Sequence, residues 1–201
     1  MKITARKLLF ESYDSRDLLI INIQPSMSGR LKFKIEDFGA WLNNVGDEFD
    51  NIHFFYNGEN KQDNPVTITK WYENEGGIND GIISQSQNIQ ALASYFDGLL
   101  DSNYTDDEIV LVGKYLLSRN YDKVSNMTPD ELQQLTISSQ FKEDLSKNKY
   151  KFAIPHELYR DLNEMSRPIV VGGLGHDCMR MIELSFKIIN KNYEKLEDWV
   201  F

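Results

Sequence analysis

The apolar residues of the chain fall into short continuous runs separated by longer amphipathic stretches. Residues 18–23 (LLIINI), 51–56 (NIHFFY) and 168–172 (PIVVG) are apolar on nearly every position. Such runs are typical of strands that are buried on both faces of a parallel sheet. The last residues, 193–201 (YEKLEDWVF), predict a further strand that closes the chain.

Apolar positions at helical spacing predict the helices between these strands. A first helix is indicated by Ile35, Phe38, Leu42, Val45 and Phe49, which share one face at a period of 3.6 residues. By the same criterion, helices are expected over 155–165 and 178–190. The order strand, helix, strand at the start of the chain predicts a right-handed βαβ unit.

The middle of the chain has a different pattern and predicts mainly helices. Thr105 with Glu108 fits a capping box, and Thr128 with Glu131 fits a second one. Residues 57–88 are rich in Asn, Gly and Gln and predict loops with one short helix around Trp71.

These patterns predict an α/β fold of the three-layer, Rossmann-like kind, with a mainly parallel sheet and helices on both faces. We expect one domain over residues 1–201, with a helical insertion at roughly 85–148. Ligands of such folds bind beyond the carboxyl ends of the strands. Asn22, Gln24, Asn57, Gly58 and the turn over 172–178 should all lie near that edge.

Composition narrows the classes of function. The net charge of the 201 residues is −9, which repels phosphate backbones and disfavours nucleic acid as a partner. No apolar run approaches the roughly 18 to 20 residues that cross a membrane, and no secretion signal is evident at the start. A single Cys fits a reducing compartment. We therefore expect a cytoplasmic protein without a membrane partner.

The stretch VVGGLGHDCM, at 170–179, is the strongest candidate for chemistry. Gly172, Gly173 and Gly175 permit a sharp turn and the close approach of a ligand, and Cys178 follows where a helix begins. A helix N-terminus favours anions and lowers the pKa of a thiol. Two interpretations stay open: Cys178 is a nucleophile, or it is a small apolar residue in a turn that Asp177 caps.

Two of these segments resemble the isochorismatase-like cysteine hydrolases. LLIINIQPSM, at 18–27, is similar to the first strand of that family, a pattern of the kind LLVIDMQNDF. Residues 169–200 resemble the family's nucleophile region, with strand, Gly, turn, Cys, helix and a closing strand near Glu-Asp. The resemblance covers about half of the chain.

The resemblance implies roles for particular residues. Cys178 matches the nucleophile and Lys149 the family's Lys, with Lys151 as the weaker match, whereas Asn22 stands where the family has its Asp base. An amide lacks the basicity to take the thiol proton. His176 is a substitute base to consider. The residues expected to contact a substrate at this edge are Gln24, Tyr56, Asn57, Gly173, Gly175 and Asp177.

Metals and cofactors are not expected. The Asp-x-His-x-x-x-His set that one branch of the family uses for a metal is missing after the second strand, where His53 stands alone. Carboxylates at Asp14, Asp17 and 106–108 suggest a metal-dependent nuclease as a lesser alternative, although capping and solvation explain them better.

Two functional hypotheses remain. One is a cysteine hydrolase of a small amide-type substrate with an altered catalytic apparatus. The other is a non-catalytic relative that binds a small molecule, a protein partner or a second copy of itself. The Asn- and Lys-rich composition suggests an AT-rich genome, such as that of a low-GC bacterium or a phage.

Overall fold

The structure is a computed structural model that describes residues 15–97, 99–100, 103–147, 153–173 and 177–201. The chain divides into two compact units, which are described separately. The sheet unit comprises Met1–Asn88, Met165–Met179 and Tyr193–Phe201. The helical unit comprises Ile89–Glu164 and Arg180–Asn192.

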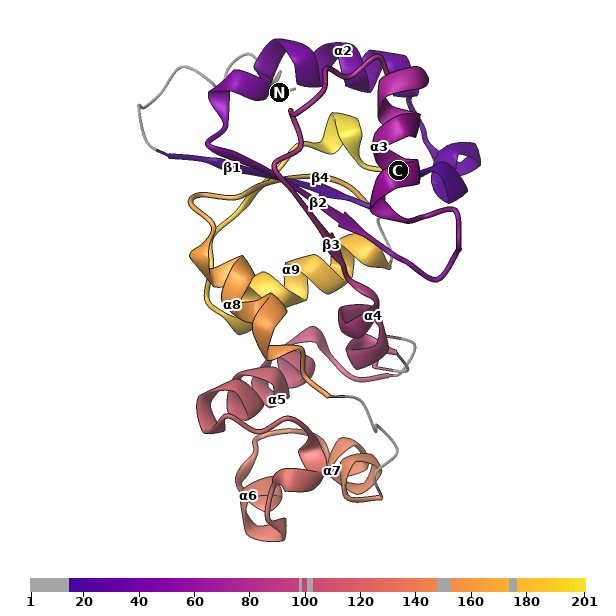
Figure 1. Cartoon of the computed structure of the whole chain (residues 1–201). Helices are drawn as coiled ribbons and strands as arrows, with labels where there is room; N and C mark the ends of the chain where they lie inside the picture. The colour runs from indigo at the N-terminus through magenta and orange to yellow at the C-terminus, as the bar shows by residue number, and fades with distance from the viewer. Residues whose placement is uncertain (1–14, 98, 101–102, 148–152, 174–176) are drawn as a thin grey trace. The chain divides into compact units, whose positions relative to one another are not determined.

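The sheet unit contains five parallel strands in the order β3-β2-β1-β4-β5 (Figure 1). The strands are β1 (Asp17–Ile21), β2 (Asn51–Tyr56), β3 (Gln85–Asn88), β4 (Ile169–Gly172) and β5 (Glu194–Lys195). Strands β2 and β3 extend the sheet on one side of β1, whereas β4 and β5 extend it on the other. This reversal places a topological switch point between β1 and β4, as in doubly wound folds. The predicted Rossmann-like α/β class with a parallel sheet is confirmed.

One face of the sheet packs against α2 (Ile35–Val45) and α3 (Pro65–Asn74). The phenolic hydroxyl of Tyr72 donates to the carbonyl oxygen of Ile23 at 2.6 Å, which ties α3 to the end of β1. The buried residues that form this core from strands and helices include Leu18, Ile20, Phe54, Val171, Phe38, Leu42, Ile68 and Tyr72.

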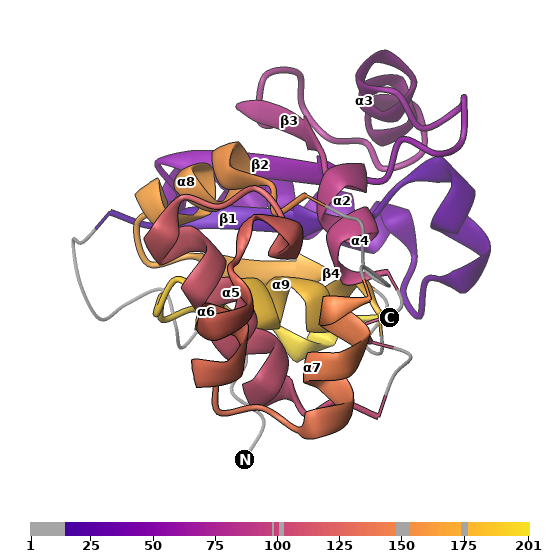
Figure 2. The same cartoon turned by 90° about the horizontal axis from the view of Figure 1, so that it is seen from below.

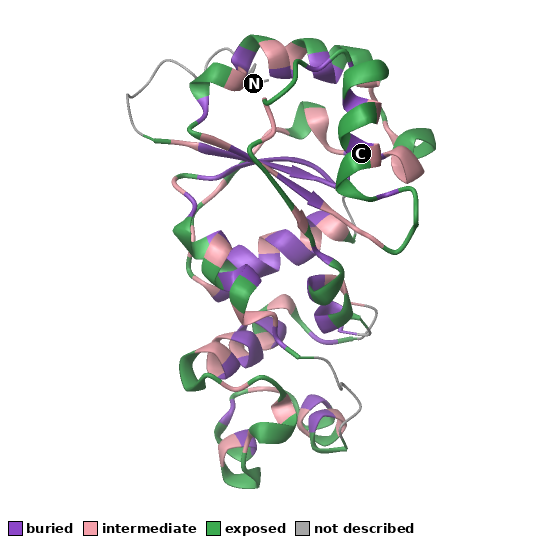
Figure 3. Ribbon diagram, viewed as in Figure 1, coloured by how far each residue is buried: buried purple, intermediate pink, exposed green. Residues whose placement is uncertain are grey.

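The strands are apolar on their second face as well. Leu19, Ile21, Phe55 and Val170 alternate with the residues of the first core, and they too are buried. Figure 3 shows the central strands coloured mainly as buried. The central strands are therefore buried on both faces, as their continuous apolar runs predict.

Two strands depart from the prediction. β3, with the sequence QSQN, lies at the sheet edge, and most of its side chains are exposed. It was not predicted because its sequence has no apolar pattern. The final strand is only Glu194–Lys195, and a 3₁₀ turn over Glu197–Trp199 follows it. In a continuous strand, Leu196 and Trp199 would face opposite sides, because side chains alternate. The turn instead brings both into the same apolar cluster, together with Phe201.

The helical unit consists of short helices (Figure 2). Its helices are α4 (Gln90–Phe96), α5 (Asp106–Arg119), α6 (Pro129–Gln134), α7 (Ser139–Ser146), α8 (His156–Glu164) and the greater part of α9 (Cys178–Ile188). In the part of the chain that the structure describes, no helix is long and apolar enough to cross a membrane.

The two predicted capping boxes are present in the helical unit. Thr105 caps α5 and Thr128 caps α6, each exchanging hydrogen bonds with the Glu three positions on. Glu108 also accepts a hydrogen bond from the backbone N–H of Ser138 at 2.6 Å, which joins the start of α5 to the start of α7. Each glutamate therefore satisfies backbone donors that helix termini otherwise leave unpaired.

Candidate functional site

The carboxyl ends of three strands meet at one edge of the sheet unit. Ile21 of β1 is aligned with Phe55 of β2 and with Gly172 of β4. The residues that follow these positions, including Asn22 and Gly173, therefore emerge side by side at the switch point between β1 and β4. Asn22, Gln24, Asn57 and Gly173, which the sequence predicts to lie near this edge, come after the carboxyl ends of β1, β2 and β4. Their roles in binding stay a prediction.

Asn22 directly follows β1 and has an unusual backbone conformation. Its φ is 50°, in the left-handed region that Asn tolerates better than most side chains. The backbone N–H of Asn22 donates to the carbonyl of Phe55 at 2.8 Å, which holds this turn against β2. The residue is 1% exposed, so its side-chain amide lies inside the protein.

The amide of Asn22 contacts the thiol of Cys178, the first residue of α9. Nδ2 of Asn22 lies 2.9 Å from Sγ of Cys178 and donates a hydrogen bond to it. Cys178 itself is partly exposed. Among the described residues, Oδ1 of Asn22 has no hydrogen-bond partner, although it is buried. The site therefore combines a partly exposed cysteine with a buried amide of which only one end is paired.

The turn after β4 fits closely against the end of β1. Gly172 has a φ of +82°, and a Cβ there would lie 2.2 Å from the carbonyl oxygen of Ile21. The backbone N–H of Gly173 donates to that oxygen at 2.7 Å. A Cβ on Gly173 would lie 3.2 Å from the backbone nitrogen of Met179, in the first turn of α9. The glycines therefore let this turn approach both β1 and the beginning of α9.

Gln24 joins two loops at the same edge. Its Oε1 accepts from the backbone N–H of Asn57 at 3.1 Å, and its Nε2 donates to the carbonyl of Asn57 at 3.1 Å and to Ser26 Oγ at 3.1 Å. Gln24 is fully buried. The Gln24 side chain thus forms two hydrogen bonds with the backbone of Asn57, as a neighbouring strand would. A direct contact of Gln24 or Asn57 with a substrate stays a prediction.

Asp63 belongs to this edge and was not predicted from the sequence. It is 1% exposed, and its Oδ1 accepts from the backbone N–H of Ser26 at 3.2 Å. Its Oδ2 has no hydrogen-bond partner among the described residues. Asp63 lies in a polar segment without hydrophobic periodicity, so no pattern in the sequence marked it as buried.

Of the other predicted site residues, the structure describes Tyr56 and Asp177. Tyr56, at the end of β2, is partly buried and stacks on Phe54 with a centroid distance of 6.1 Å. Asp177 is exposed and directly precedes Cys178. Lys149, Lys151, Gly175 and His176 lie outside the described residues. The structure thus brings Asn22 and Cys178 together and leaves the roles of Lys149 and His176 as predictions.

Of the acidic residues considered for a nuclease, Asp14 lies outside the described residues. Asp17 and Asp106 are paired within the protein. Asp17 is buried rather than solvated, because it accepts hydrogen bonds from Asn51 Nδ2 at 2.9 Å and from the backbone N–H of Ser166 at 2.7 Å. Asp106 forms an ion pair with Arg180 at 2.8 Å, and this hydrogen bond lowers the pKa of its carboxyl. Within the described ranges, no three His, Cys, Asp or Glu side chains are arranged to hold a metal.

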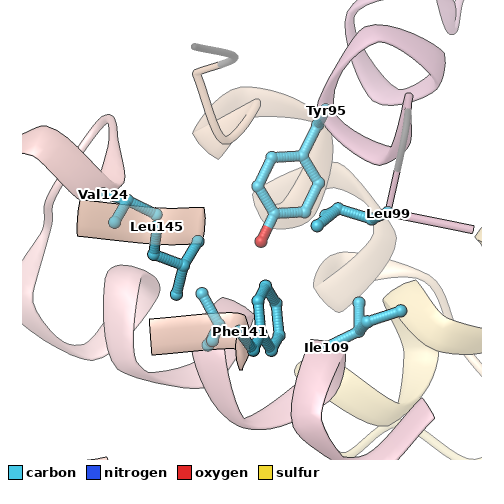
Figure 4. Close-up of a pocket in the computed structure, with 7 residues that line it drawn as sticks. Tyr95, Leu99, Ile109, Val124, Phe141 and Leu145 are labelled. Carbon is cyan, nitrogen blue, oxygen red and sulfur yellow. The ribbon is translucent and has the colours of Figure 1, made fainter. Parts of the chain in front are cut away.

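The helical unit contains a small cavity (Figure 4). Its volume is about 10 Å³, which is roughly the room for a single water molecule. The hydroxyl of Tyr95 points into it and has no hydrogen-bond partner among the described residues. The other lining residues are apolar: Leu99, Ile109, Val112, Val124, Phe141 and Leu145. The cavity is too small for an organic substrate.

Comparison with known proteins identifies no protein similar to this chain. No protein-family model matches the chain, and no curated protein and no solved structure matches it significantly. The fold and the site define a Rossmann-like α/β protein with a thiol–amide pair at the switch point of its sheet. Its resemblance to the isochorismatase-like hydrolases stays a hypothesis that rests on the residues quoted above.

Proposed function

We propose that the protein is an isochorismatase-like cysteine hydrolase with an altered catalytic apparatus, acting on a carbon–nitrogen bond of a small amide-type substrate. The observation that supports this proposal most is the contact between Asn22 Nδ2 and Cys178 Sγ at 2.9 Å. It lies at the switch point of the sheet, where folds of this class bind their ligands.

In the proposed reaction, the Cys178 sulfur attacks the carbonyl carbon of the substrate. A thioester bond forms, the carbon–nitrogen bond breaks, and the amine leaves with a proton. Water then attacks the thioester, releases the acid and restores the thiol. We assign stabilisation of the developing oxyanion to the N-terminal end of α9, because the start of a helix favours negative charge.

Asn22 changes how the thiol is activated. A carboxylate base would remove the thiol proton, but an amide cannot, because it has no useful basicity. Asn22 instead donates a hydrogen bond to the sulfur, and such a bond favours the thiolate over the thiol. The N-terminal end of α9 favours the same charged form. In this mechanism His176, the residue proposed as a substitute base, takes the thiol proton and gives it to the departing amine. Lys149 is proposed to assist electrostatically.

A second candidate function is non-catalytic ligand binding on the same scaffold. The replacement of an acidic base by Asn22 favours it, because loss of a general base commonly lowers rates by about 10²- to 10⁴-fold. In that case the edge around Asn22 and Cys178 would bind a small molecule or a partner without turnover.

Alkylation of Cys178 separates the two candidates. The rate of reaction with iodoacetamide is measured by intact mass between pH 5 and pH 10, with Cys178→Ser as the unreactive control. A hydrolase is expected to react quickly below pH ~8 and to form a thioester that hydroxylamine releases when small amides are added. Alkylation that follows an ordinary thiol, with a pKa near ~8.5, and no thioester would favour the non-catalytic candidate.

A further inference from the structure

The cavity beside Tyr95 adjoins a groove on the helical unit. The groove has a volume of about 230 Å³, whereas the cavity has about 10 Å³. Val124 and Leu145 line both of them, so these two side chains form the wall between groove and cavity. Figure 4 shows Val124 and Leu145 on one side of the space into which the Tyr95 hydroxyl points. Apolar side chains alone therefore separate this hydroxyl from the groove.

The groove has an apolar floor and an uncharged lining. Its nine described lining residues carry no charge, although 26% of the chain is charged. Leu132 and Leu145 are buried and form the floor. The lining comes from the 3₁₀ turn Val124–Asn126, the start of α6 and the end of α7: Val124, Ser125, Met127, Thr128, Pro129, Leu132, Gln133, Leu145 and Ser146. Because a charge removed from water needs a partner of opposite sign, this groove favours a neutral ligand.

The hydroxyl of Tyr95 is a hydrogen-bond donor without a partner among the described residues. Burial raises the pKa of this hydroxyl, so it keeps its proton at neutral pH. The other described residues around the cavity are apolar, and in such surroundings an unpaired hydroxyl costs free energy. The cavity has room for about one water molecule, which is also the room that one oxygen atom of a ligand needs. A ligand that brings an acceptor oxygen there would pair with the hydroxyl.

We propose that the helical unit binds a small neutral molecule that has an apolar body and a terminal carbonyl group. The apolar body lies in the groove, and the carbonyl oxygen passes between Val124 and Leu145 and accepts a hydrogen bond from the Tyr95 hydroxyl. Val124 is half-buried and borders the groove, so a change of its side-chain rotamer opens the wall. The groove is smaller than the roughly 300–1,000 Å³ of sites for drug-sized ligands, so the molecule is smaller than these.

This site is independent of the reaction proposed for Cys178, because all of its described residues belong to the helical unit. The Tyr95 hydroxyl also favours a small molecule over a macromolecule. An apolar side chain of a peptide or of a second copy of this chain could fill the groove, but it carries no acceptor at its tip. Such an occupant would leave the hydroxyl unpaired.

Three probes test the chemical features of the proposed ligand. Acetophenone has an apolar ring and a carbonyl, toluene has the ring without an acceptor, and benzoate has the ring with a negative charge. Each probe is titrated into the full chain. Dissociation constants are measured from the methyl signals of Val124 and Leu145 in two-dimensional NMR spectra, which also report where the probe binds.

Two variants test the hydrogen bond. Tyr95→Phe removes only the hydroxyl in the cavity, and it should fold at least as well as the natural protein because that hydroxyl has no partner among the described residues. Tyr159→Phe is the matched control, since Tyr159 is buried in the same unit but is not among the residues that line the groove or the cavity. Circular dichroism and thermal unfolding confirm that both variants are folded.

We expect acetophenone to shift the methyl signals of Val124 and Leu145, and benzoate to bind at least about tenfold more weakly. Tyr95→Phe should lower the affinity for acetophenone relative to toluene by about tenfold, the effect of one lost hydrogen bond. Tyr159→Phe should keep this ratio within a factor of about two.

Three results would overturn the proposal. Acetophenone could leave both methyl signals unchanged up to its solubility limit. Tyr95→Phe could weaken acetophenone and toluene equally, or weaken neither. The methyl signals could instead shift with protein concentration while the affinity ratio is the same in Tyr95→Phe and the natural protein, which would show that a second copy of the chain occupies the groove.

Discussion

Asn22 and Cys178 are separated by 156 positions in the sequence, yet the amide nitrogen of one lies 2.9 Å from the sulfur of the other. The pairing of β1 with β4 explains this proximity, because Ile21 is aligned with Gly172 and both strands end there. The contact between Asn22 and Cys178 therefore requires the turn after β4 to pack closely against β1. Substitution of a glycine in this turn tests that packing.

Replacing Gly172 by Ala should destabilise the protein strongly. The new Cβ would lie 2.2 Å from the carbonyl oxygen of Ile21, and the φ of +82° is strained for alanine. We expect a loss of about 3 kcal/mol or more in the free energy of unfolding, measured by urea denaturation.

Gly77→Ala is the matched control for this change. Gly77 has a similar φ of +61°, but a Cβ there would meet nothing within 4 Å. Only the backbone strain remains, so we expect a loss of about 1 kcal/mol. Equal losses for Gly172→Ala and Gly77→Ala would show that the turn after β4 does not press against β1 as described.

Substitution of Phe for Tyr should have opposite effects on stability at positions 95 and 72. The hydroxyl of Tyr95 is buried and has no partner among the described residues, so Tyr95→Phe removes an uncompensated polar group. We expect it to stabilise the protein by about 1 kcal/mol. The hydroxyl of Tyr72 donates to the carbonyl of Ile23 at 2.6 Å, and Tyr72→Phe leaves that buried acceptor without this donor. We expect a loss of about 1–3 kcal/mol.

Urea denaturation of the two variants and the natural protein checks this pair. A water molecule held in the cavity beside Tyr95 would satisfy the hydroxyl, and Tyr95→Phe would then be neutral or destabilising. That result would show that the Tyr95 hydroxyl does not lack a partner. A destabilising Tyr95→Phe together with a neutral Tyr72→Phe would contradict the hydrogen-bond assignments of both residues.

The elements of the central sheet were predictable because each carries a burial pattern. β2 was predicted to the residue, and β1 and β4 within two residues, since their apolar runs are long enough to specify strands. β3 was missed because an edge strand of polar residues contributes backbone hydrogen bonds and little burial. β5 was predicted too long because Trp199 and Phe201 are apolar, but a 3₁₀ turn rather than a strand brings them to the core.

The candidate site was predictable in its position and less so in its contacts. Parallel strands end at a common edge, and this rule places Asn22 near Cys178 without any knowledge of side chains. The direct bond between them depends on the left-handed turn at Asn22, which the sequence does not specify. The burial of Asp63 depends on the fold of a polar loop around Ser26, for which periodicity gives no signal.

Alkaline pH should destabilise the protein through three buried tyrosines. Burial raises the pKa of Tyr72, Tyr95 and Tyr159 above the usual value near 10. The unfolded chain releases these protons near pH ~10, whereas the folded protein retains them. The stabilisation is therefore complete below pH ~10 and is lost as the pH rises beyond it. Urea denaturation between pH 8 and pH 11 should show this decline, and Tyr95→Phe should reduce its slope, whereas a flat profile would contradict the burial of these hydroxyls.

Acid pH should destabilise the protein through its capping boxes. Hydrogen bonds from the backbone of Thr128 and from the hydroxyls of Tyr115 and Tyr121 lower the pKa of Glu131 to about 2. Because the folded pKa is depressed, the stabilisation is present above the unfolded pKa of ~4.3 and is lost as the pH falls toward 2. Glu108, whose pKa is also lowered to about 2 by the backbone of Thr105 and Ser138, should act in the same way.

Glu131→Gln tests this mechanism against Glu164→Gln, a change at an exposed glutamate near the end of α8. The glutamine at 131 still accepts a hydrogen bond but carries no charge, so the variant should be less stable at pH 7 and its stability should depend less on pH below ~5. Glu164→Gln should leave both the stability and its pH dependence close to those of the natural protein. Thermal unfolding followed by circular dichroism between pH 2.5 and pH 7 measures both quantities. If stability depends on pH in the same way for both variants, the cap of α6 contributes nothing to acid unfolding.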